Sequence, residues 1–406
     1  MPWRELSVKE QREEFVKLAL QAGANKSELC RRFGISREKG YKWLRRYRAE
    51  GCNGLADRSR RPRTSPGRTA AAIEQEVLRI RDANNDAWGG RKIAWRMAEN
   101  GWRDVPAPST ITAILRRHGK LEAGRHEHPG PLQRFERSAP NELWQIDFKG
   151  HFPLLAGRCH PLTVLDDHSR YAVGLEACAD EQDLTVRERL SRIFRRHGLP
   201  NEMLMDNGPP WGDRGGQPFT AFTVWLMRRG IGVLHGRPYH PQTQGKDERF
   251  HRTLAAEVLF GRHFGDIPAC QGAFDRWRHI YNHERPHEAL GLQPPARRYR
   301  ISARPFVEAL PPIEYRPGDQ VRRVDDNGVL QFKGRRLRVG KAFRGQDVAL
   351  RQGSEDGVLS VHFCHQHIGS LDLRRAPPTC GMVDILDTMP TNPQAQPHRQ
   401  PARLTP

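Results

Sequence analysis

Two carboxylates in this sequence occupy positions that strands ordinarily give to apolar residues. Asp147 lies in the middle of the strand-like run WQIDFKG, and Asp206 ends the apolar run MLMD directly before an Asn-Gly turn. Burying an unpaired carboxylate is costly, so strands rarely carry one without a chemical task. Each acid alone is weak evidence, because an Asp at the end of a strand is often only a turn former or a cap.

A third acid is expected on the helical pattern that begins at about Gly245, within HPQTQGKDERFHRTL. A projection at about 100° per residue places Glu248 at the edge of the apolar face and Asp247 on the polar side. Glu257 borders the same face, but about 13 Å further along the helix axis. We therefore predict that Glu248 is the acid that leans toward the sheet.

Three converging carboxylates, without a candidate Cys or Ser nucleophile, are typical of a site for divalent metal ions. Hard carboxylate oxygens suit Mg²⁺ or Mn²⁺. Two such ions can activate an attacking oxygen and stabilise the leaving oxygen in phosphoryl transfer. We therefore predict that Asp147, Asp206 and Glu248 are the catalytic residues and hold two ions of Mg²⁺ or Mn²⁺.

The segment that must position these acids has an α/β pattern. From about residue 141, three strand-like runs are followed by a helix, a strand, a helix, a strand and a helix. This order describes a mixed five-stranded sheet of the ribonuclease-H-like type. The pattern predicts a catalytic core with C-terminal helices over residues 141–300, with a hairpin turn at Asp166–Arg170.

The chain before this core is expected to be all-α and to bind DNA. In NKSELCRRFGISREKGYKWLRRYR, Ser27 and Ser36 can each cap a helix, an arrangement typical of a helix-turn-helix. A plain helical hairpin is the alternative, but the basic second helix favours DNA. We predict that Arg37, Lys39 and Lys42 on this helix contact DNA.

A basic linker follows, in which Arg60, Arg61 and Arg63 either lie along DNA or belong to a solvated tether. Two further folded units are expected: a second helix-turn-helix capped by Ser109, and a small β-barrel indicated by short β runs with Gly-bearing turns. The expected boundaries are helix-turn-helix 1–56, linker 57–69, second helix-turn-helix or winged-helix-like unit 70–120, linker 121–140, barrel 313–375 and a disordered tail 376–406.

The bulk composition points to a polyanionic partner. The formal net charge is +20, with 67 Lys and Arg against 47 Asp and Glu, which favours nucleic acid. A membrane surface is the rival polyanion, but no run of about 18 apolar residues is present. Nothing resembles an export signal, and seven scattered cysteines form no C-x-x-C pair. These features predict a cytoplasmic, nucleoid-associated protein without zinc, because strand alternation would also split the ligands of HFCHQH between two faces.

The ordered motifs of the chain resemble a known family. WQIDFKG, VLDDHSRY, LMDNGPPW, PYHPQTQGKDERFHRTL and YNHERPHEALGLQPPARRY are similar to integrase-core, DDE-type transposases of bacterial insertion sequences, which are relatives of retroviral integrases. The resemblance covers most of the chain. It implies that Asp147, Asp206 and Glu248 form a metal-binding triad. It also implies a homo-oligomer that holds the terminal inverted repeats and inserts them into target DNA.

The reaction implied by this resemblance is hydrolysis that frees a 3′-hydroxyl, followed by attack of that hydroxyl on target DNA. The spacing from Asp206 to Glu248 exceeds the retroviral one, which fits a surface insertion near residues 212–217. The retroviral zinc-binding module is replaced by helix-turn-helix units. Near the metals, we predict that DNA is held by Gln244, Lys246, Arg249 and Arg252.

Three other functions are compatible with parts of the pattern. A sequence-specific regulator would explain the helix-turn-helix and the charge, but not the acids. A stand-alone nuclease would need the acids but not two DNA-reading units. An inactive, domesticated transposase is the third alternative, against which the complete triad argues.

Overall fold

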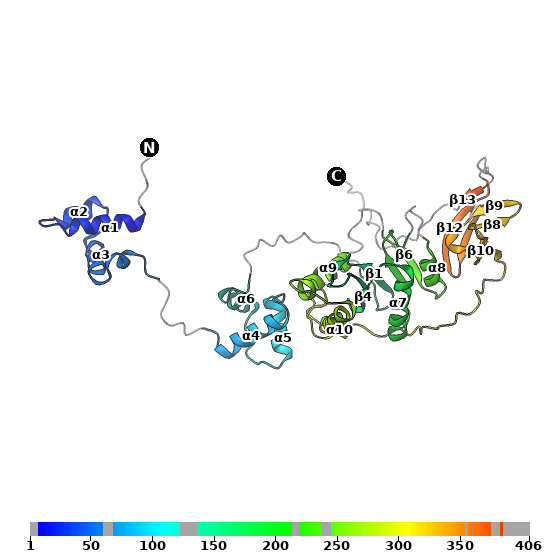
Figure 1. The fold of residues 1–406 in the computed structure, drawn as a ribbon, viewed down its shortest axis with the longest axis horizontal. Helices are drawn as coiled ribbons and strands as arrows, with labels where there is room; N and C mark the ends of the chain where they lie inside the picture. The colour runs from blue at the N-terminus through cyan, green and yellow to red at the C-terminus, as the bar shows by residue number, and fades with distance from the viewer. Residues whose placement is uncertain are drawn as a thin grey trace, which may run out of the picture. The chain divides into compact units, whose positions relative to one another are not determined.

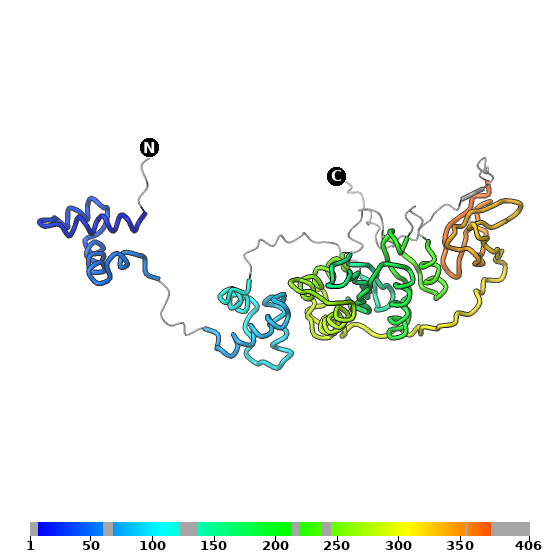
Figure 2. The backbone as a smooth tube through the Cα atoms, in the orientation of Figure 1, coloured from blue at the N-terminus to red at the C-terminus, as the bar shows by residue number. Residues whose placement is uncertain are grey.

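The computed structural model describes residues 7–59, 68–121, 136–212, 219–236, 245–353 and 356–374, with the backbone of 382–384. The chain divides into two units, Met1–Arg68 and Thr69–Pro406, whose elements are drawn in Figure 1 and whose course is traced in Figure 2. None of the helices in the described part of the chain has the length and apolar character that crossing a membrane requires.

The first unit is a helix-turn-helix, as the sequence predicts. Its elements are α1 Val8–Ala19, α2 Lys26–Arg32, α3 Arg37–Glu50 and the 3₁₀ turn η1 Gly51–Leu55. The Ser36 hydroxyl accepts from the backbone N–H of Lys39 at 3.2 Å and caps α3. The predicted Ser27 cap is wrong, because the side-chain Oδ1 of Asn25 accepts from the backbone N–H groups of Ser27 and Glu28 at 3.1 and 3.2 Å. Ser27 therefore lies inside α2, and Asn25 satisfies its first free donors.

The second unit begins with three helices around a small apolar core. They are α4 Ala71–Ala83, α5 Gly90–Glu99 and α6 Pro108–Arg117. Trp88, Ile93, Met97 and Ile111 are among the side chains buried between them. The predicted Ser109 cap is wrong: α6 starts after Ala107 without a side-chain cap. Pro108 occupies the first position of the helix, where its missing N–H costs nothing.

The central sheet is mixed, as predicted, and contains one short strand more than the predicted five. Its strands run in the order β4, β3, β1, β5, β6, with the short β2 also paired to β3. β1 is antiparallel to β3 and parallel to β5, and β6 continues the parallel part. The strands are β1 Leu143–Phe148, β2 Phe152–Pro153, β3 Arg158–Asp166, β4 Ala172–Cys178, β5 Glu202–Met205 and β6 Gly232–His235.

Helices cover both faces of this sheet. Trp144 and Ile146 of β1 share one apolar cluster with α7 and α8, whereas Leu165 and Leu175 share another with α9 and α10. Because side chains alternate along a strand, Asp147 lies on the opposite face from Trp144 and Ile146. The helices and turns are α7 Asp183–His197, α8 Ala221–Met227, α9 Gly245–Leu254, the π-helical η3 Ala255–Leu259, α10 Ile267–His283, η4 Glu288–Leu290 and η5 Pro295–Arg297.

The C-terminal part forms two small sheets rather than the predicted barrel. The described strands pair in the orders β12-β11-β10-β7 and β13-β9-β8, and these two sheets do not close on each other. After β7, the backbone of Val324 pairs with Gly345 and Gln346 in the turn that leads into β10. The elements are β7 Gln320–Arg323, β8 Val329–Phe332, β9 Arg335–Arg338, η6 Lys341–Phe343, β10 Asp347–Gln352, β11 Val358–Phe363, β12 Gln366–Asp372 and β13 Met382–Asp384.

β13 lies within the segment 376–406, whose composition predicts disorder, and it pairs in parallel with β9. The other residues of that segment are outside the described part of the chain.

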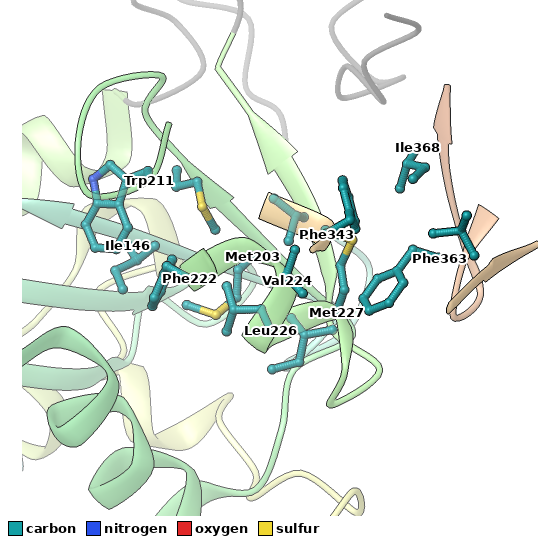
Figure 3. Packing of buried hydrophobic residues seen from close by; sticks show 14 of the residues in the cluster. Ile146, Met203, Trp211, Phe222, Val224, Leu226, Met227, Phe343, Phe363 and Ile368 are labelled. Atoms are coloured by element: carbon teal, nitrogen blue, oxygen red, sulfur yellow. The ribbon is translucent and has the colours of Figure 1, made fainter. Parts of the chain in front are cut away.

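The C-terminal sheets share an apolar core with the catalytic-core segment. Phe343 and Phe363 lie close to Met227 of α8 in this cluster (Figure 3). The buried Gln366 side chain accepts from the N–H of Val233 at 3.0 Å and donates to its C=O at 3.1 Å. Val233 lies on β6, the edge of the central sheet, so Gln366 satisfies backbone groups that an open edge would leave free.

Candidate active site

Asp147 and Asp206 lie side by side on neighbouring parallel strands. The register of β1 and β5 pairs Gln145 with Leu204, and two residues further along it brings Asp147 level with Asp206. Neighbouring strands are about 4.8 Å apart, and positions in register point to the same face. Both acids line a cavity of ≈ 470 Å³ together with Glu181 and Trp211. The structure thus brings together two of the three predicted acids.

Burial and neighbouring negative charge dominate the electrostatics of Asp147. Loss of solvent, then the charge of Asp206 and that of Glu181, raise its pKa to about 7. The backbone N–H of Phe148 donates to Asp147 Oδ1 at 2.8 Å and opposes the shift. A carboxyl group with its pKa raised in this way is stabilised in its ionised form by a nearby cation.

Glu181 is a residue of this cavity that the sequence analysis missed. It follows β4 in a polar loop, and its Oε1 lies 2.8 Å from Nδ1 of His160. The only sequence signal was its place just after a strand, which does not distinguish it from its neighbours Asp180 and Gln182.

Helix α9 is anchored beside Asp147 by a chain of hydrogen bonds. The Thr163 hydroxyl donates to the C=O of Asp147 at 3.0 Å and lies 2.9 Å from Nε2 of His251. His251 Nε2–H is therefore the donor to Thr163. Burial, with a contribution from Lys149, lowers the pKa of His251 to about 4, so the ring is neutral at physiological pH.

A second anchor holds the start of α9. The buried Asp167 carboxylate accepts from the N–H of Arg137 at 2.8 Å and from Gln145 Nε2 at 2.7 Å. It also pairs with the ammonium of Lys246. Lys246, which the sequence analysis assigned to DNA, thus faces an internal partner. The first turn of α9 is tied to β1 through Asp167 and Gln145.

The orientation predicted for the first turn of α9 is wrong. Asp247 is 1% exposed, whereas Glu248 is exposed to solvent. Asp247 precedes Phe250 and Leu254 by three and seven residues, which is the spacing of a single helical face, and all three are buried. The projection assigned Asp247 to the wrong side of that face.

Glu257 has a structural partner instead of a place in the cavity. Its carboxylate accepts from Trp277 Nε1 at 2.8 Å and from Arg285 Nε at 2.9 Å. These contacts join η3 to α10 and to the chain that follows it.

Glu248 remains geometrically compatible with a role beside Asp147. It precedes His251 by three residues, and residues three apart occupy the same face of a helix. The His251 face meets β1 and β3 at Thr163, so Glu248 extends that face into solvent. Among the described residues, no three His, Cys, Asp or Glu side chains already lie close enough together to hold a metal ion.

The hairpin between β3 and β4 has the predicted turn at Asp166–Arg170. Asp166 is fully buried and accepts from the N–H groups of Asn141 and Ser169, at 2.7 and 2.8 Å. Arg170 donates to Glu136 at 2.9 Å. These contacts fix the turn between β3 and β4, and this turn contains Asp167.

The residues predicted to touch DNA are mostly on exposed helix surfaces. Arg37, Lys39 and Lys42 are exposed on α3, and Lys42 Nζ lies 5.2 Å from the centre of the Trp43 ring. Arg249 and Arg252 are exposed on α9. Outside the described residues lie Arg60, Arg61, Arg63 and Gln244.

Comparison with known families gives matches along most of the chain. An integrase core domain matches residues 137–241, and a second integrase core description matches 229–295. The C-terminal domain of IS481 family transposases matches 319–379. A helix-turn-helix domain matches 11–63, and a homeodomain-like domain matches 39–115.

Individual relatives agree with these matches. The 39.2 kDa protein of insertion element IS476 from Xanthomonas euvesicatoria is 30% identical over 159 residues, or 39% of this chain and 44% of that protein. The 31.7 kDa protein of IS407 from Burkholderia multivorans is 29% identical over 190 residues, or 46% of this chain and 66% of that protein. The chain thus spans about half to two thirds of these relatives.

Among solved structures, the chain is similar to a chain of the simian T-cell lymphotropic virus intasome. It is 13% identical over 70% of this chain and 91% of its own, with a TM-score of 0.37. The HTLV-2 integrase catalytic core domain in complex with magnesium is 15% identical over 40% of this chain and 99% of its own, with a TM-score of 0.31.

The mixed sheet and the integrase core matches define a ribonuclease-H-like core of the integrase class, preceded by helix-turn-helix units. Through its IS481-type C-terminal match, its integrase core matches and its insertion-element relatives, the chain is similar to the transposases of bacterial insertion sequences.

Proposed function

We propose that this protein binds the ends of its insertion sequence, cleaves them and joins them to target DNA in a reaction that depends on divalent metal ions. The observation that carries the proposal is the pairing of Asp147 and Asp206 in one cavity, with the helix that carries Glu248 anchored to the backbone of Asp147 through His251 and Thr163. The exposed basic side chains of α3 and α9 support DNA as the substrate. In this proposal the protein works as a homo-oligomer on DNA in the cytoplasm.

The residues of the site fit Mg²⁺ or Mn²⁺. Asp147, Asp206 and Glu248 would hold the metal through hard carboxylate oxygens. Burial and the charge of Asp206 raise the pKa of Asp147, and a bound cation would offset both. Two bound ions would supply charge that activates the attacking oxygen and stabilises the leaving one. No zinc site is part of the proposal.

The two steps use the same displacement at phosphorus. In the first, a water oxygen bonds to phosphorus while the P–O3′ bond breaks, which leaves a 3′-hydroxyl on the element and a 5′-phosphate on the flank. In the second, the 3′-hydroxyl oxygen bonds to a target phosphorus and the target's own 3′-oxygen leaves. One carboxylate site serves both steps because only the attacking oxygen differs.

The test uses purified full-length protein, labelled duplexes carrying the element's own ends, and Mg²⁺ or Mn²⁺. The wild type should nick the ends and join them to a target duplex. Glu248→Gln should bind the ends normally but cleave more slowly by on the order of 10²-fold or more, the scale of losing one group that stabilises developing charge. Glu188→Gln removes a charge from an exposed position on α7 and should cleave like the wild type.

Two results would contradict the proposal. Cleavage by Glu248→Gln at the wild-type rate would exclude Glu248 from the triad. Wild-type protein that binds the ends but never nicks them with either metal would favour a DNA-binding regulator or an inactive transposase.

A further inference from the structure

Asp247 is a buried carboxylate without a hydrogen-bond donor among the described residues. It is 1% exposed, and neither of its oxygens has a hydrogen-bond partner. Buried polar groups in folded proteins are nearly always satisfied, and an unpaired buried carboxylate is costly. A group of this kind indicates that a donor or a cation belongs next to it.

The two anchors of α9 locate this carboxylate. Lys246 is held by Asp167, which is bound to Gln145 of β1. His251 is held by Thr163, which is bound to the backbone of Asp147, two residues further along the same strand. Asp247 lies between the anchored positions and faces inward, so its carboxylate lies under the first turn of α9, close to β1.

Other carboxylates lie on the same side of α9 as Asp247. Asp167 is bound to Gln145 of β1, and Asp147 lies two residues further along that strand, level with Asp206 of the neighbouring strand. The ammonium next to Asp247 in the sequence, that of Lys246, is already paired with Asp167. Asp247 itself has no hydrogen-bonding cation among the described residues.

We propose that Asp247 is a further carboxylate ligand of the divalent-metal site, placed beneath Glu248 and next to Asp147. This inference rests on the proposed function. Carboxylate oxygens of this kind suit Mg²⁺ or Mn²⁺, and a bound ion would give both unpartnered oxygens a partner.

The alternative is that Asp247 is a neutral, protonated acid with a purely structural role. The two possibilities differ in how the protein binds metal, because Asn imitates a protonated Asp in shape and charge. Asp247→Asn would leave metal binding intact if the acid were neutral, and it would weaken metal binding if the carboxylate were a ligand.

The experiment measures Mn²⁺ binding to the full-length protein by the electron paramagnetic resonance signal of free Mn²⁺, without DNA. Asp247→Asn and Glu248→Gln should each lower the affinity by roughly tenfold or more. Asp326→Asn removes the same charge from an exposed turn before β8 and should bind Mn²⁺ like the wild type. Circular dichroism checks that each variant is folded. If Asp247→Asn does not fold, Mn²⁺ binding is measured on Asp247→Ser, which also lacks the carboxylate.

Wild-type Mn²⁺ affinity in a folded Asp247→Asn or Asp247→Ser protein would overturn the inference. If Glu248→Gln alone weakens Mn²⁺ binding, the metal site stands and only the role of Asp247 fails. If Asp247→Asn weakens Mn²⁺ binding while the wild type never cleaves its ends, Asp247 remains a ligand and the proposed function fails.

Discussion

At the scale of single residues, the Asp147 carboxyl couples metal binding to pH. Its pKa of about 7 results from burial first and from the charges of Asp206 and Glu181 second. A metal ligand must be deprotonated to bind. Occupation of the proposed site therefore requires Asp147 to release its proton.

The expected result is a Mn²⁺ affinity that rises with pH through about 7. Below that value the affinity should fall by at least about tenfold per pH unit, because Asp147 must lose its proton before it binds the ion. The measurement is Mn²⁺ binding from about pH 5.5 to about 8.5. Asp147→Asn should bind weakly and with a shallower slope, and a variant that kept the full slope would assign the proton to another group.

The same pKa has a consequence for the metal-free protein. The folded state binds a proton on Asp147 that the unfolded chain, with an ordinary carboxyl, has already released. The contribution of this group to stability is therefore fully present below the ordinary Asp value near 4 and is lost as pH rises through about 7.

Some residues of the candidate site could be predicted from the sequence and others could not. Asp147 and Asp206 were recognisable because acids are unusual inside apolar strands. The phase of α9 was predictable in principle, since Asp247, Phe250 and Leu254 share one face, but the projection assigned the acid wrongly. Glu181 was not predictable, because a single sequence does not reveal which side chain of a polar loop turns into a cavity.

At the scale of elements, the first turn of α9 depends on the pair formed by Asp167 and Lys246. This pair joins the end of the β3 strand to the helix that carries Glu248. Asp167 is 4% exposed, and its other contacts are neutral donors. Removing its charge therefore affects the helix more than the hairpin.

Asp167→Asn should slow end cleavage by roughly tenfold while end binding stays unchanged, because a small displacement of a catalytic group costs rate. The double variant Asp167→Asn/Lys246→Gln should recover part of that loss, since two amides can bond where a lone ammonium cannot. Cleavage rates and end binding are measured in parallel. If Lys246→Gln alone weakens binding and leaves the cleavage rate unchanged, Lys246 contacts DNA as the sequence analysis proposed.

The order of the elements was predictable, but the closure of the C-terminal sheets was not. Strand alternation and apolar helix spacing are local properties, and they indicated the succession of strands and helices from β1 to α9. A barrel requires the two C-terminal sheets to close through their edge strands, and such pairing joins residues far apart in the sequence, as Val324 pairs with residues 345 and 346. The N-cap of α2 was ambiguous in the sequence. Asn25 and Ser27 lie two residues apart, and both residue types are good N-caps.

At the scale of the whole molecule, the formal charge of +20 must be expressed on particular surfaces to bind DNA. α3 exposes Arg37 and Lys39 near its N-terminus, where the second helix of a helix-turn-helix meets DNA. α1 exposes Lys9 and Lys17, and that helix has no predicted contact. The two pairs carry equal charge. Comparing their removal therefore distinguishes DNA contacts made by α3 from the effect of the net charge of the protein.

Binding of the element's ends should fall steeply with salt, because each phosphate contact releases counterions. Arg37→Gln/Lys39→Gln should make the slope of log affinity against log salt concentration shallower by about 2, which is about one for each lost contact. Lys9→Gln/Lys17→Gln should leave the slope at the wild-type value. Fluorescence anisotropy over a series of salt concentrations measures both. Equal slopes in the two variants would mean that α3 does not carry the contacts, and a flat response in the wild type would exclude binding driven by a basic surface.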